Sequence, residues 1–220
     1  MRSAWQWILA LAMSTMIVFS FITDAPQQNI GESSRIFYYH IPQAWICVIA
    51  FIISAIYSAK FLKSKNLLDD DRAVNAARLG FMFCILATVT GSIFAKVTWG
   101  SFWNWDPRET SIFILLLIYA AYFALRGAMD EEHKRAQLAS VYSIMASITV
   151  PFLVFVVPRI TPSLHPEDSI IDENMKFTMS PEVRMIFFSS LIIFTVIFIW
   201  MFKLDNRISF LERFQKEKEA

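Results

Sequence analysis

Six stretches of the chain, each 15 to 20 residues long, are mainly apolar and contain no charged residue. A helix needs about 20 mostly apolar residues to cross a bilayer. The apolar runs are continuous rather than alternating, which excludes the strands of a membrane barrel. The pattern therefore predicts an all-α, polytopic membrane protein with six transmembrane helices. The stretches are Trp5 to Ile22, Ile41 to Ala59, Leu79 to Ala95, Ser111 to Leu125, Leu138 to Val157 and Met185 to Phe202.

The overall composition excludes several other classes of protein. Hydrophobic residues make up 56% of the 220 residues and charged residues only 18%, whereas about a quarter of a soluble domain is charged. A formal net charge of +1 creates no field that would attract a polyanion. We therefore expect neither a compact soluble enzyme nor a nucleic-acid-binding domain. No internal repeat is visible, so residues 1–220 are predicted to form a single integral-membrane domain.

Basic residues are divided unevenly among the loops that six spans would create. The termini and the even-numbered loops hold 14 Lys and Arg residues, and the odd-numbered loops hold 6. Lys and Arg accumulate in the short loops on the cytoplasmic side of a membrane. Both termini are therefore expected in the cytoplasm. The odd-numbered loops would face outward from a bacterial-type cytoplasmic (inner) membrane.

The loops assigned to the cytoplasm are short and charged, as in Asp69 to Arg72 and Asp130 to Arg135. We expect them to be solvated connectors, too short for a catalytic domain. Cys47 and Cys84 lie inside apolar stretches, where a thiol behaves as a small hydrophobic side chain. The sequence has no CxxC or CxxCH motif. Any function is therefore expected within the membrane or on its outer face.

The third loop, at about residues 96–110, is rich in tryptophan. Trp99, Trp103 and Trp105 fall within seven residues of one another. One interpretation is an aromatic belt at the membrane interface, where Trp accumulates. The other is an outward platform of apolar rings that suits a large planar ligand. Composition alone does not separate these two interpretations.

The end of this loop has the spacing of a helix start. Asp106 fits an N-cap, Pro107 the first helical position and Glu109 the third, as in an acidic capping box. We expect Asp106 to act through this geometry, as a cap and not as an acid–base catalyst, so Asn or Ser should replace it better than Ala. Arg108 is different, because a cation at a helix start opposes the helix dipole. This mildly unfavourable position indicates that Arg108 has an anionic partner, either a lipid headgroup or a ligand carboxylate.

Two of the three histidines are placed beside this loop. His40 is expected at the outer end of the second helix and His165 in the fifth loop, whereas His133 is expected in a charged cytoplasmic loop and solvated. Either outer histidine alone would most simply be hydrogen-bonded to a neighbour or to water. Together they flank the tryptophan-rich loop, an arrangement that suits axial ligation of haem iron with Arg at the propionates.

The segment Trp99 to Thr110 resembles the WWD signature, WGxxWxWDxRxT, of haem-handling proteins in cytochrome c maturation. The stretch Tyr38 to Trp45 is similar to the segment around the first outer histidine of the CcmC family. Length, six spans, cytoplasmic termini and a histidine in each flanking outer loop also match that family. The resemblance covers nearly the whole chain. Two features depart from it: Phe102 stands where CcmC proteins often have Trp, and the WDPRET run is closer to the larger haem lyases (CcmF and CcsA types).

The resemblance implies a non-enzymatic membrane protein that holds haem at the outer face and presents it to a CcmE-like haem chaperone. It implies non-covalent, b-type haem, lipid around the helices, and CcmA-, CcmB- and CcmD-like partners of an ABC transporter complex. Nucleic acid is not an expected partner. The implied haem-binding residues are His40 and His165 as axial iron ligands, with Trp99, Trp103, Trp105, Asp106 and Arg108 around the haem, and Arg35 and Arg159 as alternative propionate partners.

Two other functions stay open at this point. A subunit of a cytochrome c haem lyase would usually need further histidines inside the membrane, either on a longer chain or on a partner. A solute permease would need polar or charged groups at mid-bilayer depth, where these stretches offer little beyond hydroxyl groups, sulfur atoms and glycine. Whether the purified protein binds haem separates the permease from the haem-handling functions.

Overall fold

The computed structural model describes residues 4–26, 30–165, 170 and 176–219. Within these ranges it contains six helical stretches that are long and apolar enough to cross a membrane, which confirms the prediction of an all-α protein with six such helices. Their α-helical parts are α1 (Ala4–Ile22), α2 (Phe37–Ser64), α3 (Leu67–Trp99), α4 (Pro107–Gly127), α5 (Glu132–Pro151), α6 (Val157–Ile160) and α7 (Pro181–Glu219).

Two short non-α segments complete the helical stretches. A 3-10 turn at Gly31–Ile36 leads into α2, and a π-helical turn at Phe152–Val156 joins α5 to α6 in one continuous stretch. The π turn directly follows Pro151, whose ring nitrogen cannot donate to the helical hydrogen-bond ladder. α4 extends beyond its apolar stretch, Ser111 to Leu125, at both ends, from Pro107 to Gly127.

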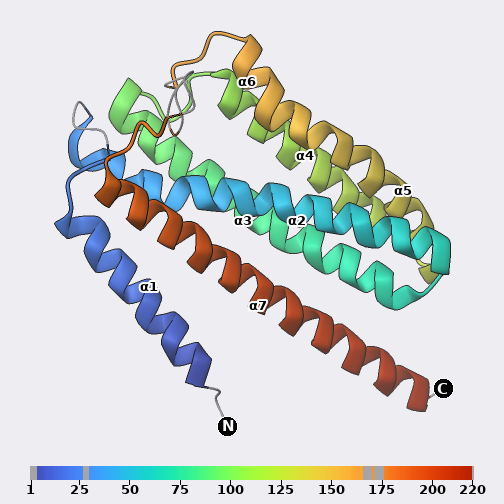
Figure 1. The fold of residues 1–220 in the computed structure, drawn as a ribbon. Helices are drawn as coiled ribbons and strands as arrows, with labels where there is room; N and C mark the ends of the chain where they lie inside the picture. Colours follow the sequence, from blue (N-terminus) through green and yellow to red (C-terminus); the bar gives the residue numbers. More distant parts are fainter. Residues whose placement is uncertain (1–3, 27–29, 166–169, 171–175, 220) are drawn as a thin grey trace.

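The helices form an elongated bundle around an antiparallel pair, α2 and α3 (Figure 1). α5 packs on α2, α4 packs on both α3 and α5, and α7 crosses the α2–α3 pair. α1 packs mainly on α7 and lies at the edge of the bundle. The start of α1 lies beside the middle of α7, where the Trp5 and Trp200 ring centroids are 5.2 Å apart, so both termini lie away from the end of the bundle where α1 ends and α7 begins (Figure 1), as an even number of spans requires.

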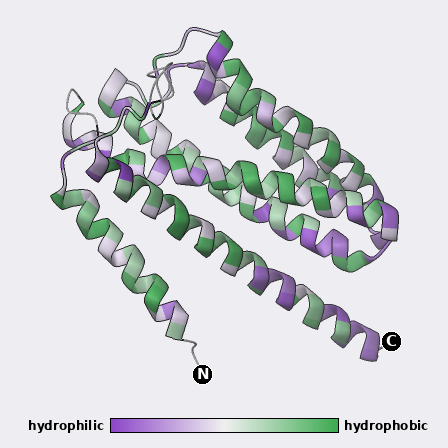
Figure 2. Ribbon diagram, in the orientation of Figure 1, coloured by the Kyte–Doolittle hydropathy of each residue, from purple (hydrophilic) through white to green (hydrophobic). Residues whose placement is uncertain are grey.

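Apolar residues cover the middle of every long helix, and hydrophilic residues gather towards the helix ends (Figure 2). Many of the apolar side chains face outward, including Ile8 at 66% exposure and Ile192 at 63%. In a soluble protein such an apolar outer surface would drive aggregation, whereas in a bilayer it faces lipid tails. The distribution therefore supports the membrane interpretation and the expected contact with lipid.

The end of the bundle where α7 ends is more structured than the sequence predicted. Arg126 forms a two-pronged ion pair with Asp70, at 2.7 and 2.8 Å, and the Asp70 side chain is only 2% exposed. Arg213 near the end of α7 pairs with Asp71, and Asn75 donates to Asn206 and Ser209. The expectation of a solvated connector at Asp69 to Arg72 is therefore wrong. These residues form the first turn of α3 and pack against the extended end of α7, where a buried carboxylate requires a paired cation.

Candidate ligand-binding site

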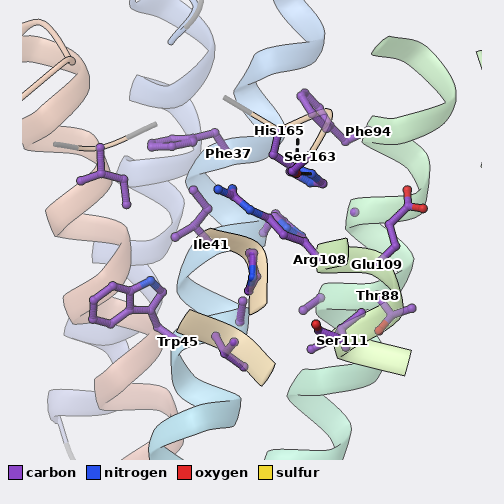
Figure 3. Close-up of a pocket in the computed structure, with 18 of the residues that line it drawn as sticks. Phe37, Ile41, Trp45, Thr88, Phe94, Arg108, Glu109, Ser111, Ser163 and His165 are labelled. Carbon is purple, nitrogen blue, oxygen red and sulfur yellow. Dashed lines mark hydrogen bonds between the residues drawn. The ribbon is translucent and has the colours of Figure 1, made fainter. Parts of the chain in front are cut away.

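A cavity of about 920 Å³ lies at the opposite end of the bundle, among α2, α3, α4, the π turn and α7. Its volume falls within the range of about 300–1,000 Å³ that is typical of small-molecule sites. Most of the wall is apolar, with Phe37, Ile41 and Trp45 on α2 facing Phe94 and Thr88 on α3 (Figure 3). A few polar side chains, among them His40, Arg108 and His165, complete the lining, as in sites that orient a mostly apolar ligand.

His40 lines this cavity from the first turn of α2. The helix begins at Phe37, four residues before the charge-free stretch, so His40 lies within the helix rather than before it. Its Nδ1 lies 3.0 Å from the hydroxyl oxygen of Thr90 on α3. That contact leaves Nε2 as the ring nitrogen that is not engaged by Thr90.

His165 lines the same cavity from the loop after α6. Its Nδ1 lies 3.0 Å from a carboxylate oxygen of Asp106, and its ring meets the Trp99 indole edge-on at a centroid distance of 4.7 Å. An ionised carboxylate only accepts hydrogen bonds, so the proton of the neutral imidazole is on Nδ1. The lone pair of Nε2 is consequently available to a metal, the arrangement that an outer carboxylate imposes on metal-binding histidines.

Asp106 is the N-cap of α4 and also the partner of the His165 loop. The capping box predicted from the sequence is confirmed: Asp106 accepts from the Arg108 N–H, and Glu109 accepts from the Asp106 N–H. The second carboxylate oxygen of Asp106 accepts from the Ser163 hydroxyl at 2.8 Å and the Leu164 N–H at 2.6 Å. One side chain therefore fixes both the start of α4 and the position of His165.

These hydrogen bonds also determine the charge of the pair. Burial opposes ionisation of Asp106, but the N–H groups of Arg108 and Leu164 and the Ser163 hydroxyl outweigh it and lower its pKa. Burial lowers the pKa of His165 to about 4, with Asp106 opposing that shift and with Arg108 and His40 adding to it. At neutral pH the pair is therefore a carboxylate and a neutral imidazole, the form that binds a metal.

We expect the ring signals of His165 to titrate near pH 4 in NMR spectra of the ligand-free protein labelled at histidine. Because the pKa is lowered, the imidazole stays neutral from neutral pH down through 6.5, the ordinary value, and protons compete for Nε2 only in more acidic solution. The His165→Gln variant assigns the signal by its disappearance. A midpoint near 6.5 for that signal would contradict the burial of the ring.

Arg108 extends into the cavity from the first turn of α4 (Figure 3). Within the described part of the chain, its guanidinium has no hydrogen bond or ion pair. Arg159 also lines the cavity, but it donates to the Phe155 carbonyl at 2.7 Å. Arg35 lies outside the lining residues, where it pairs with Glu32 and donates to the Ser20 carbonyl. Of the three arginines considered from the sequence, Arg108 therefore has the guanidinium most available to an anionic ligand.

The three tryptophans of the loop do not form one flat surface. Trp103 lines the cavity, whereas Trp99 packs on the His165 ring from outside the lining. Trp105 is 72% exposed and stands at 90° to Trp103, with 6.0 Å between the ring centroids. Trp105 also has a φ of 56°, which is uncommon for a bulky residue and directs the chain into the Asp106 cap. The loop thus supplies one wall ring, one ring that supports a histidine and one exposed ring.

Three residues of the site were not identified from the sequence. Thr90 and Gly91 contact His40, and Ser163 binds Asp106. Thr and Gly are ordinary in an apolar helix, so their types carry no signal. The contacts join residues 50 and 57 positions apart in the chain, beyond the reach of local spacing patterns.

The arrangement suits one kind of ligand chemistry. Two imidazoles with available Nε2 atoms share an apolar, aromatic cavity with Arg108, whose guanidinium has no hydrogen bond or ion pair in the described residues. The same residues contain no group of three His, Cys, Asp or Glu side chains that would hold a bare metal ion. A metal already held in a planar, carboxylate-bearing macrocycle fits this donor set, because it needs only axial ligands from the protein.

Known proteins resemble this chain over much of its length. A protein from Marchantia polymorpha, named "Putative cytochrome c biosynthesis ccmC-like mitochondrial protein", is 35% identical over 144 residues, which cover 65% of this chain and 60% of that protein. The "Heme exporter protein C" of Bradyrhizobium diazoefficiens is 34% identical over 125 residues, 57% of this chain and 48% of that protein. The Escherichia coli K12 protein of the same name is 28% identical over 194 residues, 84% of this chain and 75% of that protein.

The matched segment of this chain spans about half to three fifths of the first two relatives. The family model described as CcmC, heme exporter protein C, matches residues 1–220. That match covers the tryptophan-rich loop, His40 and His165, and the six apolar helical stretches of the described residues. The chain therefore belongs to the CcmC family.

Proposed function

We propose that this chain is a membrane haem-delivery protein, which binds haem at one membrane face and presents it for c-type cytochrome biogenesis. The observation that carries the proposal is the shared cavity of His40 and His165, with each Nδ1 engaged by a neighbour and Arg108 alongside. The names of the relatives support it, since they refer to haem export and cytochrome c biosynthesis.

The proposed roles follow the geometry of each side chain. His40 and His165 ligate the iron, Trp103 contacts the porphyrin, and Trp99 holds the His165 ring. Asp106 fixes His165 and the start of α4, while Arg108 meets a propionate. The exposed Trp105 stands beside Trp103, where a partner protein that takes the haem can reach it.

The bound haem is proposed to be b-type and non-covalent. Covalent attachment in c-type cytochromes uses the thiols of a CxxCH motif, which this sequence lacks. Cys47 and Cys84 are fully buried between α2 and α3, and neither lines the cavity. The chemistry proposed for the chain is therefore reversible ligation, a transport role rather than catalysis.

The proposed partners are a CcmE-like haem chaperone and the CcmA-, CcmB- and CcmD-like subunits of an ABC transporter complex. A delivery protein needs an acceptor, because haem held by two histidines does not leave the site efficiently without one. The proposed location is the cytoplasmic (inner) membrane of a bacterial-type cell, with the cavity on the outer face. The excess of basic residues at the opposite end supports this orientation.

Reporter fusions test the orientation directly. A fusion after Ile30 and a fusion within residues 100–106 should both report the outer side, because these loops lie at the cavity end. Fusions after Ser64 and after Gly127 serve as matched controls and should report the cytoplasm. An inward report from the 100–106 loop would place the site on the wrong face for delivery to an outer chaperone.

The absorption spectrum of the purified protein with added haem tests the function. We expect a six-coordinate, bis-histidine spectrum, with haem that organic solvent extracts completely. A preparation that binds no haem would favour the alternative of a solute permease. Haem attached covalently to an apocytochrome by this protein in the absence of other factors would favour the haem lyase alternative.

A charge-specific prediction concerns Arg108. Replacing it with Gln removes a charge-assisted contact of about 1.5–3 kcal/mol, so haem affinity should fall about 10- to 100-fold. The affinity for haem dimethyl ester, which lacks both carboxylates, should be unchanged by the same substitution. Arg35→Gln is the matched control, because Arg35 is outside the cavity lining. Equal losses for haem and its diester would show that Arg108 acts through packing and not through a propionate.

A further inference from the structure

Thr90 determines which nitrogen of His40 carries the proton. Its hydroxyl donates to the carbonyls one turn earlier on α3, at 2.8 Å to Leu86 and 3.1 Å to Ala87. The single hydroxyl proton is therefore used, and the oxygen is left as an acceptor. The contact of 3.0 Å to His40 is then an Nδ1–H donated to Thr90, and the His40 ring has a further neutral partner in the Ala87 backbone. As a result, the Nε2 lone pair of His40 is available to a ligand.

Gly91 determines where the ring of His40 can lie. A Cβ added at Gly91 would be 2.9 Å from Cε1 of His40 and 3.5 Å from its Nδ1. Real Cβ contacts of 2.9 Å essentially do not occur, so the ring rests against the α3 backbone in space that any side chain would fill. Glycine in a helix interior costs about 1 kcal/mol of stability relative to alanine. The close approach of the His40 ring explains why glycine stands at position 91 despite that cost.

The two histidines are held by acceptors of different strength. His165 donates its Nδ1–H to the carboxylate of Asp106, whereas His40 donates to the neutral hydroxyl of Thr90. A carboxylate acceptor raises the basicity of a metal-binding imidazole, and hydrogen bonds to a charged acceptor are about twice as strong as neutral ones. The two Nε2 atoms are therefore unequal as donors to iron.

We propose that Thr90 and Gly91 are the positioning residues of His40, and that their neutral environment makes His40 the weaker iron ligand, the one that opens first when haem leaves. The proposal rests on the haem-delivery function proposed above. It assigns His165, with Asp106, the role of the ligand that keeps haem in the cavity during transfer.

Haem loss to excess apomyoglobin tests the role of Thr90. Thr90→Val removes the acceptor but keeps the shape, so haem loss should be about tenfold faster, the lower end of the effect of an outer-shell partner. Thr90→Ser keeps the hydroxyl and should restore the wild-type rate. The matched control is Thr195→Val, because Thr195 also donates to a carbonyl one turn earlier, that of Leu191, but does not line the cavity. The reduction potential should shift upward in Thr90→Val alone, a change that loosened packing would not produce selectively.

Gly91→Ala should displace the His40 ring and also accelerate haem loss. Gly80→Ala is its control, since a Cβ there would meet the Phe51 ring at 2.7 Å and disturb helix packing away from the site. If Gly80→Ala and Gly91→Ala accelerate haem loss equally, packing of α2 on α3 and not the ring position is responsible. That result would overturn the role of Gly91.

The order of ligand opening is tested with imidazole as a substitute ligand. His40→Ala with imidazole should retain haem within about threefold of the wild-type rate, whereas His165→Ala with imidazole should lose it at least tenfold faster. The reverse order would overturn the proposal. If the wild-type protein binds no haem, the proposed function itself fails. If haem binds but Thr90→Val and Thr195→Val behave alike, only this inference fails.

Discussion

Replacing either His40 or His165 with alanine should remove the six-coordinate haem spectrum, and replacing both should abolish haem retention. Each imidazole lines the cavity with an Nε2 that its hydrogen-bonding neighbour leaves free. Loss of an iron ligand should lower the affinity for haem by more than the ~10–100-fold that loss of an outer-shell partner costs. Titration of the purified variants with haem measures this directly.

The third histidine provides the control. His133 lies at the start of α5 and lines only a small cavity at the opposite end of the bundle, so His133→Ala should bind haem as the wild type does. Added imidazole should restore a six-coordinate spectrum to the single variants by filling the vacant axial position. Equal losses in all three variants would indicate general instability and count against ligation.

The architecture could be predicted because the bilayer strongly constrains the backbone. Every peptide group inside the membrane must be hydrogen-bonded, so continuous apolar stretches such as Met185 to Phe202 become helices. Helix ends were harder to place. α3 begins at Leu67 and α7 continues to Glu219, well beyond their apolar stretches. The charged residues there pair between helices, as Arg213 does with Asp71, and local hydropathy does not contain that information.

The candidate site also has features that local sequence patterns predict and others that depend on contacts between distant residues. The cap at Asp106 follows from the spacing to Glu109, a local pattern, and the structure confirms it. The bond between Asp106 and His165 joins residues 59 positions apart, and only tertiary packing creates it. The tryptophans illustrate the limit of composition, because the residue type predicts an aromatic surface but not that Trp105 lies outside the cavity lining.

Asp106 is both the N-cap of α4 and the hydrogen-bond partner of His165. Its replacement should therefore affect haem binding as well as helix capping. Four donors surround its carboxylate: the N–H groups of Arg108 and Leu164, the Ser163 hydroxyl and the His165 Nδ1–H. An asparagine amide offers one acceptor oxygen, so two of these donors would face an NH₂ group or lose their partner. Each buried unsatisfied donor costs about 1–3 kcal/mol. We therefore expect Asp106→Asn to lower haem affinity about 10- to 100-fold, almost as much as Asp106→Ala, although as a cap alone asparagine would serve well.

Asn66→Ala separates capping from the second role of this side chain. Asn66 caps α3 at the other end of the bundle by accepting from the Leu68 N–H, and it is not among the residues that line the cavity. Its loss should lower the free energy of unfolding by about 1 kcal/mol and leave haem affinity unchanged. Asp106→Asn should also lower the melting temperature, because it leaves buried donors without a partner, but it should lower haem affinity as well. If Asp106→Asn instead binds haem like the wild type while Asp106→Ala does not, the carboxylate acts only as a helix cap, and His165 does not depend on its charge.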